Sequence, residues 1–591
     1  MTPIVFDNCF GWLHAEGGRH GVVLCSSYGQ EAYATHRGWR MFADRAAAEG
    51  LTVLRFDYPG TGDSAGGEHE PVTIDEWIGS IVAAVKWLRT QANVTTVSLV
   101  GMRFGATLAA LAAARIGDID GLVLFAPVVT GRGYLRELHM RRRKWAAGAP
   151  GNDAEPLVDG AHFDLLGYGL HRDDMRPLAA IDLRRDTSAP ARRVLILDSH
   201  VRGESDGLAR HYTSHNISVT QATFDEYDRF LAEPLSSRPP RAAFERAARW
   251  LAADAARSNV HNARVPAAAA LCRDAMAIEL GAQRAVERPV VFGAYFGVYC
   301  EPERRQHDLP AILIVNTSAG HHIGDGHLSV LLARRLAFGG IASLRMDVAG
   351  LGGATPAAAD VNIDTVFSAR ASSDAGTGAR WLAAQGHHRV VAFGVCSGAY
   401  LSLHACADHP ALAGAYAINL PKFSHRPAAG PELAQWKRYR QSLLDPRKWA
   451  RVLRGRAANP FAIARGLCFD GVRRGKFTVT HWISGGETSG IADPHVRALL
   501  HKLHQKQACV RMIFGEFDDG LPVATAHLGA DFEALRQYER IGAAVMPGLD
   551  HSVLGSQART TVLADLERWL HDQFGQRRTA EPSDEIATAP A

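Results

Sequence analysis

The sequence predicts an α/β fold class: two tandem domains, each a mostly parallel sheet with helices on both faces and a helical lid insertion. Two observations predict it. Similar segments recur in the same order at a nearly constant spacing, and within each copy short β-branched runs alternate with amphipathic helical stretches. The recurring segments are residues 10–14, 22–29, 55–64 and 101–106, which match residues 296–300, 313–320, 345–354 and 394–399.

The strands of each copy are short apolar runs separated by helical or polar stretches. In the first copy the expected strands are 22–25, 52–57, 97–101, 122–126, 192–198 and 218–224. In the second copy they are 311–315, 341–347, 389–394, 414–419, 510–514 and 543–547. A wide gap between two later strands predicts a helical lid at about 130–188 in the first copy and about 421–506 in the second.

Composition shifts give the domain boundaries. We expect a first domain over 1–256, a linker over 257–275, a second domain over 276–574 and a disordered polar tail over 575–591. The length of 591 residues and the apolar fraction of 47% suit two domains with their own cores.

The location and the class of partner follow from charge and cysteine content. The net charge of +4 is too small to predict nucleic-acid binding. The eight cysteines lack C-x-x-C spacing, so we expect them to be reduced thiols. No secretory signal opens the chain, and no apolar run is long enough to span a bilayer. We therefore expect a cytoplasmic protein, without a cofactor or metal.

Two glycine-flanked turns connect a strand to a helix, GMRFGA at 101–106 and GVCSGA at 394–399. This is the setting of a nucleophile elbow, a strained turn that exposes a nucleophile over the end of a sheet. Together with the D-x-x-G-x-G turn at 57–62, these motifs resemble the α/β-hydrolase superfamily. The resemblance is closest to the serine-aminopeptidase-like hydrolases, including those that accompany exosortase systems. It implies a hydrolase fold in both halves, but it does not identify the substrate.

In the second copy the elbow residue is Cys396, which we predict to be the nucleophile because a thiol ionises more readily than a hydroxyl. The alternative is a small buried residue at a strand end. A base and an acid follow in the chain order of α/β-hydrolases, with Asp518 after one strand and His551 after the next. Asp519 and Asp550 are alternative acids, and we prefer Asp518.

Two backbone N–H groups are needed to stabilise an oxyanion. One is expected from Ser397, the residue after the nucleophile, and the other from Ser318 or Thr317 in the loop after the first central strand. His321 and the neighbouring His322 could touch substrate or could form a polar loop wall.

The first copy lacks catalytic residues at the corresponding places. Arg103 stands at its elbow, and the chain has no histidine between His215 and His261. This half is predicted to be a pseudoenzyme. Arg103 could bind an anionic substrate group above the sheet, or it could pair with a carboxylate such as Asp57.

The second lid is strongly basic. Residues 421–476 hold 14 Lys and Arg against three Asp and Glu, a net charge of +11, and they also contain Trp449, a candidate substrate contact. The basic charge could be a solvated helical face, an entrance for an anionic acyl carrier, or a docking surface for an anionic membrane. Nucleic acid is the least favoured partner, and the oligomeric state is left open.

A cysteine elbow in this fold resembles dienelactone hydrolases and cysteine-type acyltransferases and thioesterases. The first hypothesis is acyl transfer or hydrolysis through a Cys396 acyl-enzyme, with an acyl thioester of coenzyme A or a carrier protein as donor, in a biosynthetic pathway. The alternatives are simple ester hydrolysis on a glycan or small metabolite, and a non-catalytic binding protein.

Overall fold

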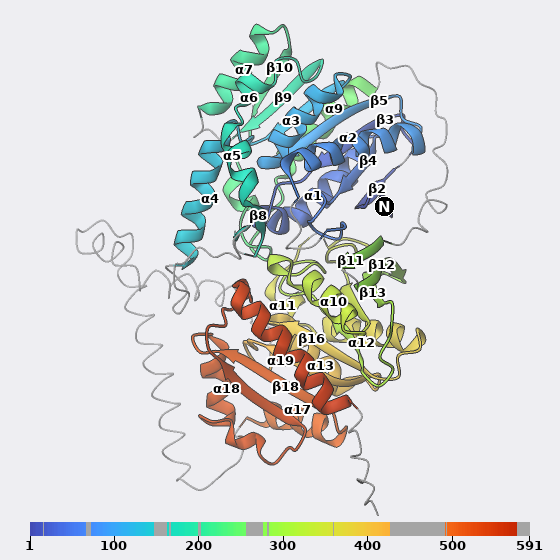
Figure 1. Ribbon diagram of the computed structural model, residues 1–591, viewed down its shortest axis with the longest axis vertical. Helices are drawn as coiled ribbons and strands as arrows, with labels where there is room; N and C mark the ends of the chain where they lie inside the picture. The colour runs from blue at the N-terminus through green and yellow to red at the C-terminus, as the bar shows by residue number, and fades with distance from the viewer. Residues whose placement is uncertain are drawn as a thin grey trace, which may run out of the picture.

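The computed structural model describes residues 1–15, 17–66, 72–146, 162–164, 167–198, 203–255, 276–280, 283–358, 360–425, 491 and 493–575. The predicted linker, residues 576–591 of the predicted tail, residue Trp449 and most of the second lid lie outside these ranges. Figure 1 shows the N-terminal half, in blue to green, above the C-terminal half, in yellow to red.

The N-terminal sheet has eight strands in the order β1-β2-β4-β3-β5-β6-β9-β10. The first two pairings are antiparallel and the remaining five are parallel. The strands are β1 (Thr2–Phe6), β2 (Cys9–His14), β3 (His20–Cys25), β4 (Thr52–Phe56), β5 (Thr96–Met102), β6 (Gly121–Phe125), β9 (Arg193–Asp198) and β10 (Ser218–Thr223).

The C-terminal sheet repeats this order after one additional strand, giving β11-β12-β13-β15-β14-β16-β17-β18-β19. Its strands are β11 (Met276–Leu280), β12 (Gln283–Phe292), β13 (Tyr295–Pro302), β14 (Ala311–Ile314), β15 (Ser343–Asp347), β16 (Val390–Val395), β17 (Leu412–Ile418), β18 (Cys509–Gly515) and β19 (Ile541–Met546). The predicted fold class, two mostly parallel sheets of the α/β-hydrolase type, is confirmed.

Helices cover both faces of each sheet, because each helix buries one apolar stripe. In the N-terminal half, α1 (Gln30–Ala48) and α9 (Arg241–Ala255) pack on one face. The other face is covered by α2 (Ile74–Gln91), α3 (Phe104–Ile116) and α7 (Glu204–Ser214). After β6 the chain forms α4 (Gly131–Ala146), the hairpin β7 (His162–Asp164) and β8 (Gly169–His171), α5 (Arg172–Ala180) and α6 (Leu183–Asp186).

The C-terminal half is covered in the same way. One core includes residues of α12 (Ala369–Ala384), α13 (Ser397–Asp408), α17 (Pro494–Gln505) and α18 (Gly520–Leu528), and the opposite core includes residues of α10 (Leu328–Phe338) and α19 (Ser556–Phe574). The short elements are η2 (Asp325–His327), α11 (Ile363–Val366), η3 (Glu533–Leu535) and, in the N-terminal half, α8 (Tyr227–Phe230).

The two domains meet through equivalent strands, β2 and β13. Phe10 and Trp12 of β2 pack with Phe296 and Val298 of β13 in one buried cluster, and the Trp12 and Phe296 rings are 4.4 Å apart. Phe10 and Phe296 occupy matching positions in the two repeats. Equivalent positions of the two repeats thus face each other in this contact, with the Phe10 and Phe296 rings 6.2 Å apart.

Replacing Trp12 by alanine is expected to destabilise the protein by about 3–5 kcal/mol, because the indole fills the centre of the domain contact. Thermal unfolding followed by circular dichroism should show a melting transition at least about 6 °C lower than that of the wild type. Met140→Ala, at an exposed side chain of α4, is the control and should change little. An unchanged transition for Trp12→Ala would contradict the importance of this cluster.

Candidate active site

The turn after β16 has the geometry of a nucleophile elbow. Cys396 lies between β16 and α13 with φ 54° and ψ −115°, a conformation that L-residues seldom adopt. The flanking glycines permit it, since a Cβ on Gly394 would come within 2.1 Å of the backbone of Gly398. The Cys396 side chain is partly exposed. The turn thus presents a thiol at the C-terminal end of the central strand.

An imidazole and a carboxylate lie beside this thiol. His551 follows β19, and its Nδ1 is 2.5 Å from Oδ2 of Asp518, which follows β18 and has a buried side chain. The backbone N–H of Gly520 donates to the other Asp518 oxygen at 2.7 Å, which fixes the carboxylate. A carboxylate bound to Nδ1 leaves Nε2 to exchange a proton with the nucleophile.

The alternative acids are placed differently. The carboxylate of Asp550 accepts the backbone N–H groups of Ser552, Leu554 and Gly555 and so shapes the loop that carries His551. Asp519 is exposed at the start of α18. Among these three carboxylates, Asp518 is the one that the structure places against the imidazole.

The proton on His551 is held strongly. Burial lowers its pKa, but hydrogen bonds with Asp518 and Cys396 outweigh burial and raise the pKa to about 10. The imidazole is therefore protonated at neutral pH, although its side chain is 48% exposed. An imidazolium next to a cysteine stabilises the thiolate, which is the nucleophilic form.

The loop after β14 approaches the elbow. Residues 316–322, here called the oxyanion loop, contain Ser318 at φ 55°, and the Ser318 backbone N–H donates to Oγ of Ser397 at 2.6 Å. The hydroxyl of Thr317 donates to the carbonyl of Val395 at 3.2 Å. The structure thus brings Ser318 and Ser397 together beside Cys396. A substrate oxyanion that used the Ser318 N–H would displace the Ser397 hydroxyl.

His321 does not lie in the wall of this site as a substrate contact. Its ring is buried and stacks at 3.7 Å on the ring of His36, which belongs to α1 of the other domain. The ring of His321 thus lies in the contact between the domains, where Tyr33 and His36 of α1 stack on it. The neighbouring His322 is also buried in that contact.

Arg103 has the same backbone conformation as Cys396, with φ 54° and ψ −122°, but its guanidinium is enclosed. Nε donates to Glu31 at 3.1 Å and a terminal nitrogen donates to Glu137 at 2.5 Å. Of the two sequence alternatives, ion pairing is the one that the structure shows, and the partners are Glu31 and Glu137 in place of Asp57. The same two carboxylates also pair with Arg141, so the guanidinium belongs to a group of two arginines and two glutamates.

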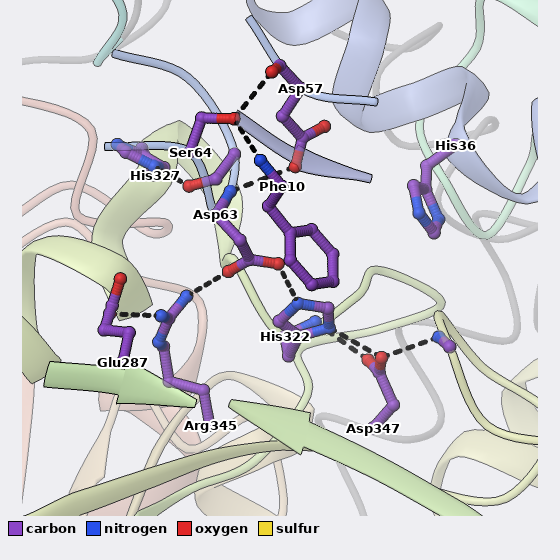
Figure 2. A network of polar contacts seen from close by, with 12 residues as sticks. Phe10, His36, Asp57, Asp63, Ser64, Glu287, His322, His327, Arg345 and Asp347 are labelled. Carbon is purple, nitrogen blue, oxygen red and sulfur yellow. Dashed lines mark hydrogen bonds and ion pairs between the residues drawn. The ribbon is translucent and has the colours of Figure 1, made fainter. Parts of the chain in front are cut away.

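Sequence reasoning missed a buried set of charges between the domains, formed by Asp63, Glu287, His322, Arg345 and Asp347 (Figure 2). A signal was available: Arg345 interrupts an apolar strand, and an arginine inside a buried strand needs a carboxylate partner. Nothing in the sequence indicates that one partner comes from the other domain.

Within the described ranges, no three His, Cys, Asp or Glu side chains gather closely enough to hold a metal ion. The helices described there include none with the length and apolar character needed to cross a membrane.

Comparisons with known proteins show what the chain is similar to. The family model described as "Serine aminopeptidase, S33" matches residues 19–151, which lie in the N-terminal domain. No curated protein matches the chain. Similar solved structures include Est1E of Butyrivibrio proteoclasticus with ferulic acid bound, at 18% identity and TM-score 0.32, covering 43% of this chain and 100% of that one.

Two further similar structures are an esterase of Pyrococcus furiosus and a dienelactone hydrolase of Anabaena variabilis. The first is 19% identical with TM-score 0.31 and covers 42% of this chain and 87% of that one. The second is 15% identical with TM-score 0.29 and covers 49% of this chain and 98% of that one.

Replacing Arg103 by alanine is expected to lower the free energy of unfolding by about 3 kcal/mol, because it leaves the buried Glu31 without one of its two arginine partners. Chemical denaturation measures this loss. Arg115→Ala removes an exposed pair with Asp75 and should cost no more than about 1 kcal/mol. A cost for Arg103→Ala as small as that of the control would contradict the structural role.

Asp518→Asn is expected to lower the rate of acylation of Cys396 by about 10⁴-fold, because the amide no longer holds His551 in the required tautomer. The pH profile should change too. In the wild type His551 loses its proton as the pH rises through about 10, so acylation that needs this proton declines there. Asp518 contributes to the raised pKa, so the decline should move to lower pH in the variant.

Single-turnover acylation by an alkyl ester, whose alcohol must leave with a proton, measures both effects across the neutral and alkaline range. Asp519→Asn is the matched control at the exposed neighbour. Equal profiles for the two variants would show that the wrong carboxylate has been assigned.

Proposed function

We propose that the C-terminal domain is a hydrolase-type enzyme that transfers or hydrolyses acyl groups through a thioester on Cys396. One observation carries the proposal: a partly exposed cysteine at a strained elbow stands beside an imidazole whose Nδ1 is 2.5 Å from a buried carboxylate. The family model, which matches the N-terminal repeat, and the same strand order in the C-terminal sheet support hydrolase chemistry at the coarser level.

The reaction follows from these groups. The Cys396 thiolate attacks the carbonyl carbon of the acyl donor, and the carbonyl oxygen takes up the negative charge that backbone N–H groups at Ser397 and Ser318 stabilise. The tetrahedral intermediate collapses as His551 gives its proton to the departing alcohol or thiol. An acyl group is then bonded to sulfur.

In the second half, His551 takes a proton from water or from another acceptor as that acceptor attacks the thioester carbon. The acyl–sulfur bond breaks, the product acid, ester or amide leaves, and the Cys396 thiolate and imidazolium are restored. A thioester intermediate retains reactivity toward amines and alcohols, so the donor proposed is an acyl thioester and the reaction includes transfer as well as hydrolysis.

The N-terminal domain is proposed to be non-catalytic. Its elbow carries Arg103, whose guanidinium cannot act as a nucleophile and is paired with two carboxylates. The proposed acyl carriers, coenzyme A or an acidic carrier protein, and the proposed contact of the basic lid with an anionic surface depend on residues outside the described ranges.

Intact mass spectrometry after incubation with a panel of acyl-CoA donors and a p-nitrophenyl ester tests the proposal. The wild type should gain the mass of one acyl group, mapped to Cys396, and Cys396→Ala should gain none. Cys396→Ser should keep a fraction of ester hydrolysis and lose transfer from thioesters. An equal adduct on Cys396→Ala, or no adduct on the wild type with any donor, would sink the proposal.

The same experiment separates the alternatives. If the acyl-enzyme forms only with activated esters and decays to the free acid even with amines or alcohols present, simple ester hydrolysis is favoured. Absence of any adduct together with slow alkylation of Cys396 by iodoacetamide favours a binding protein.

A further inference from the structure

A buried line of charged groups crosses the contact between the two domains. Asp63 of the N-terminal domain is bonded through Oδ2 to Nε2 of His322 at 2.5 Å and through Oδ1 to Arg345 at 2.5 Å. The other nitrogen of His322 is 2.6 Å from Oδ2 of Asp347. Figure 2 shows His322 between the two carboxylates, and all four side chains are buried.

The charges in this line balance one another. Burial lowers the pKa of His322, but the carboxylates of Asp347 and Asp63 outweigh it and raise the pKa to about 10, so the ring is an imidazolium. Burial raises the pKa of Asp63, but His322 and Arg345 outweigh it and hold the pKa far below its usual range. Glu287 pairs with Arg345 and Arg334 on the far side. Asp63 is therefore an anion whose removal leaves buried positive charge uncompensated.

Asp347 joins this line of charges to both ends of the oxyanion loop. Its Oδ1 accepts the backbone N–H of His322 at 2.8 Å and the side-chain amide of Asn316 at 2.9 Å. The oxygen of the Asn316 amide accepts the backbone N–H of Val348 at 2.7 Å, next to Asp347. The first and the last residue of the loop are thus held at one carboxylate, and Ser318 lies between them.

Helix α1 of the N-terminal domain contacts the same loop from another side. The rings of Tyr33 and His36 stack on His321 at 5.2 and 3.7 Å. A Cβ on Gly320 would lie 1.9 Å from the Tyr33 hydroxyl oxygen, so the helix approaches the loop backbone closely. The end of the oxyanion loop is therefore enclosed by the other domain.

The loop needs such support because its middle is strained. Ser318 has φ 55°, and its N–H is directed toward the elbow, where it donates to Ser397 Oγ. A residue in this conformation persists only when its surroundings fix it. A donor displaced by a fraction of an ångström would no longer meet the developing oxyanion.

We propose that the N-terminal domain positions the oxyanion loop of the C-terminal domain, and that Asp63, acting through His322, is the principal positioning residue. Asp63 touches neither Cys396 nor His551 in this role. It fixes the end of the loop that presents the Ser318 N–H. The inference rests on the proposed function, because it gives the non-catalytic N-terminal domain a role in the acyl chemistry of the C-terminal domain.

Two reactions of Cys396 in the full-length protein separate positioning from folding. Alkylation by iodoacetamide needs the thiolate and passes through no oxyanion. Acylation by a p-nitrophenyl ester needs the thiolate and also an oxyanion hole. The ratio of the two rates therefore reports the oxyanion loop alone.

Asp63→Asn and His322→Gln are each expected to lower acylation by about 100-fold, with the loss in kcat and little change in KM, while alkylation stays within about twofold. The double variant should lose no more than either single variant, since both act through one contact. Val298→Ala is the matched control: it removes apolar atoms from the buried cluster of the same domain contact, changes no charge, and should leave the ratio unchanged.

Unchanged acylation in folded Asp63→Asn would overturn the inference, as would an equal loss in Val298→Ala. Should Asp63→Asn fail to fold, Tyr33→Leu is the second variant, because it removes the ring stacked on His321 without exposing a buried charge. It must also lower the ratio of the acylation rate to the alkylation rate. A wild type that is neither alkylated nor acylated at Cys396 defeats the proposed function itself and this inference with it. If Cys396 is alkylated and acylated at normal rates in every variant, the inference fails and the proposed function stands.

Discussion

An imidazolium enclosed by two carboxylates, one from each domain, is the interaction on which the rest of the structure depends. His322 donates to Asp63 through one nitrogen and to Asp347 through the other, and none of the three side chains is more than 3% exposed. Buried charges of this kind add little net stability, but they are costly to separate because each removal leaves an unpaired ion. They therefore specify how the domains fit together more than how strongly they associate, and the aromatic contact of Trp12 with Phe296 supplies the apolar burial.

The same position has a different use in each repeat. By the spacing of the repeats, His322 corresponds to Glu31, and Asp63 corresponds to Gly353. Glu31 turns inward and pairs with Arg103 at its own elbow, whereas His322 turns outward and pairs with the neighbouring domain. In the N-terminal domain, Glu31 forms an ion pair with the arginine at the elbow. In the C-terminal domain, His322 at the corresponding position forms an ion pair with the other domain. A few charged positions on a shared fold thus account for this difference between the two domains.

The fold and the places of the main site residues could be predicted from the sequence because they depend on local patterns. Apolar runs, paired glycines and chain order predicted the strands, the elbow at Cys396 and the sequence positions of His551 and Asp518, and the structure places the last two side by side. The partners of Arg103 and the place of His321 could not be predicted, because they depend on side chains 34 to 285 residues away that only the folded chain brings together. Asp63 looked like a turn residue, and its turn gives no sign of a second domain.

The N-terminal elbow carries Arg103 where a nucleophile would stand, and it has the same strained turn as the elbow at Cys396. Positive φ for a non-glycine residue costs on the order of 1–3 kcal/mol, and the N-terminal elbow bears it as well. A Cβ on Gly101 would lie 2.4 Å from the carbonyl oxygen of Gly105, so the strand and the helix pack closely at this turn. The strain belongs to the crossing of strand and helix in this fold. An elbow with the correct dihedral angles is consequently a poor diagnostic of activity in such duplicated chains. What differs between the two elbows is the set of side chains that surrounds each turn.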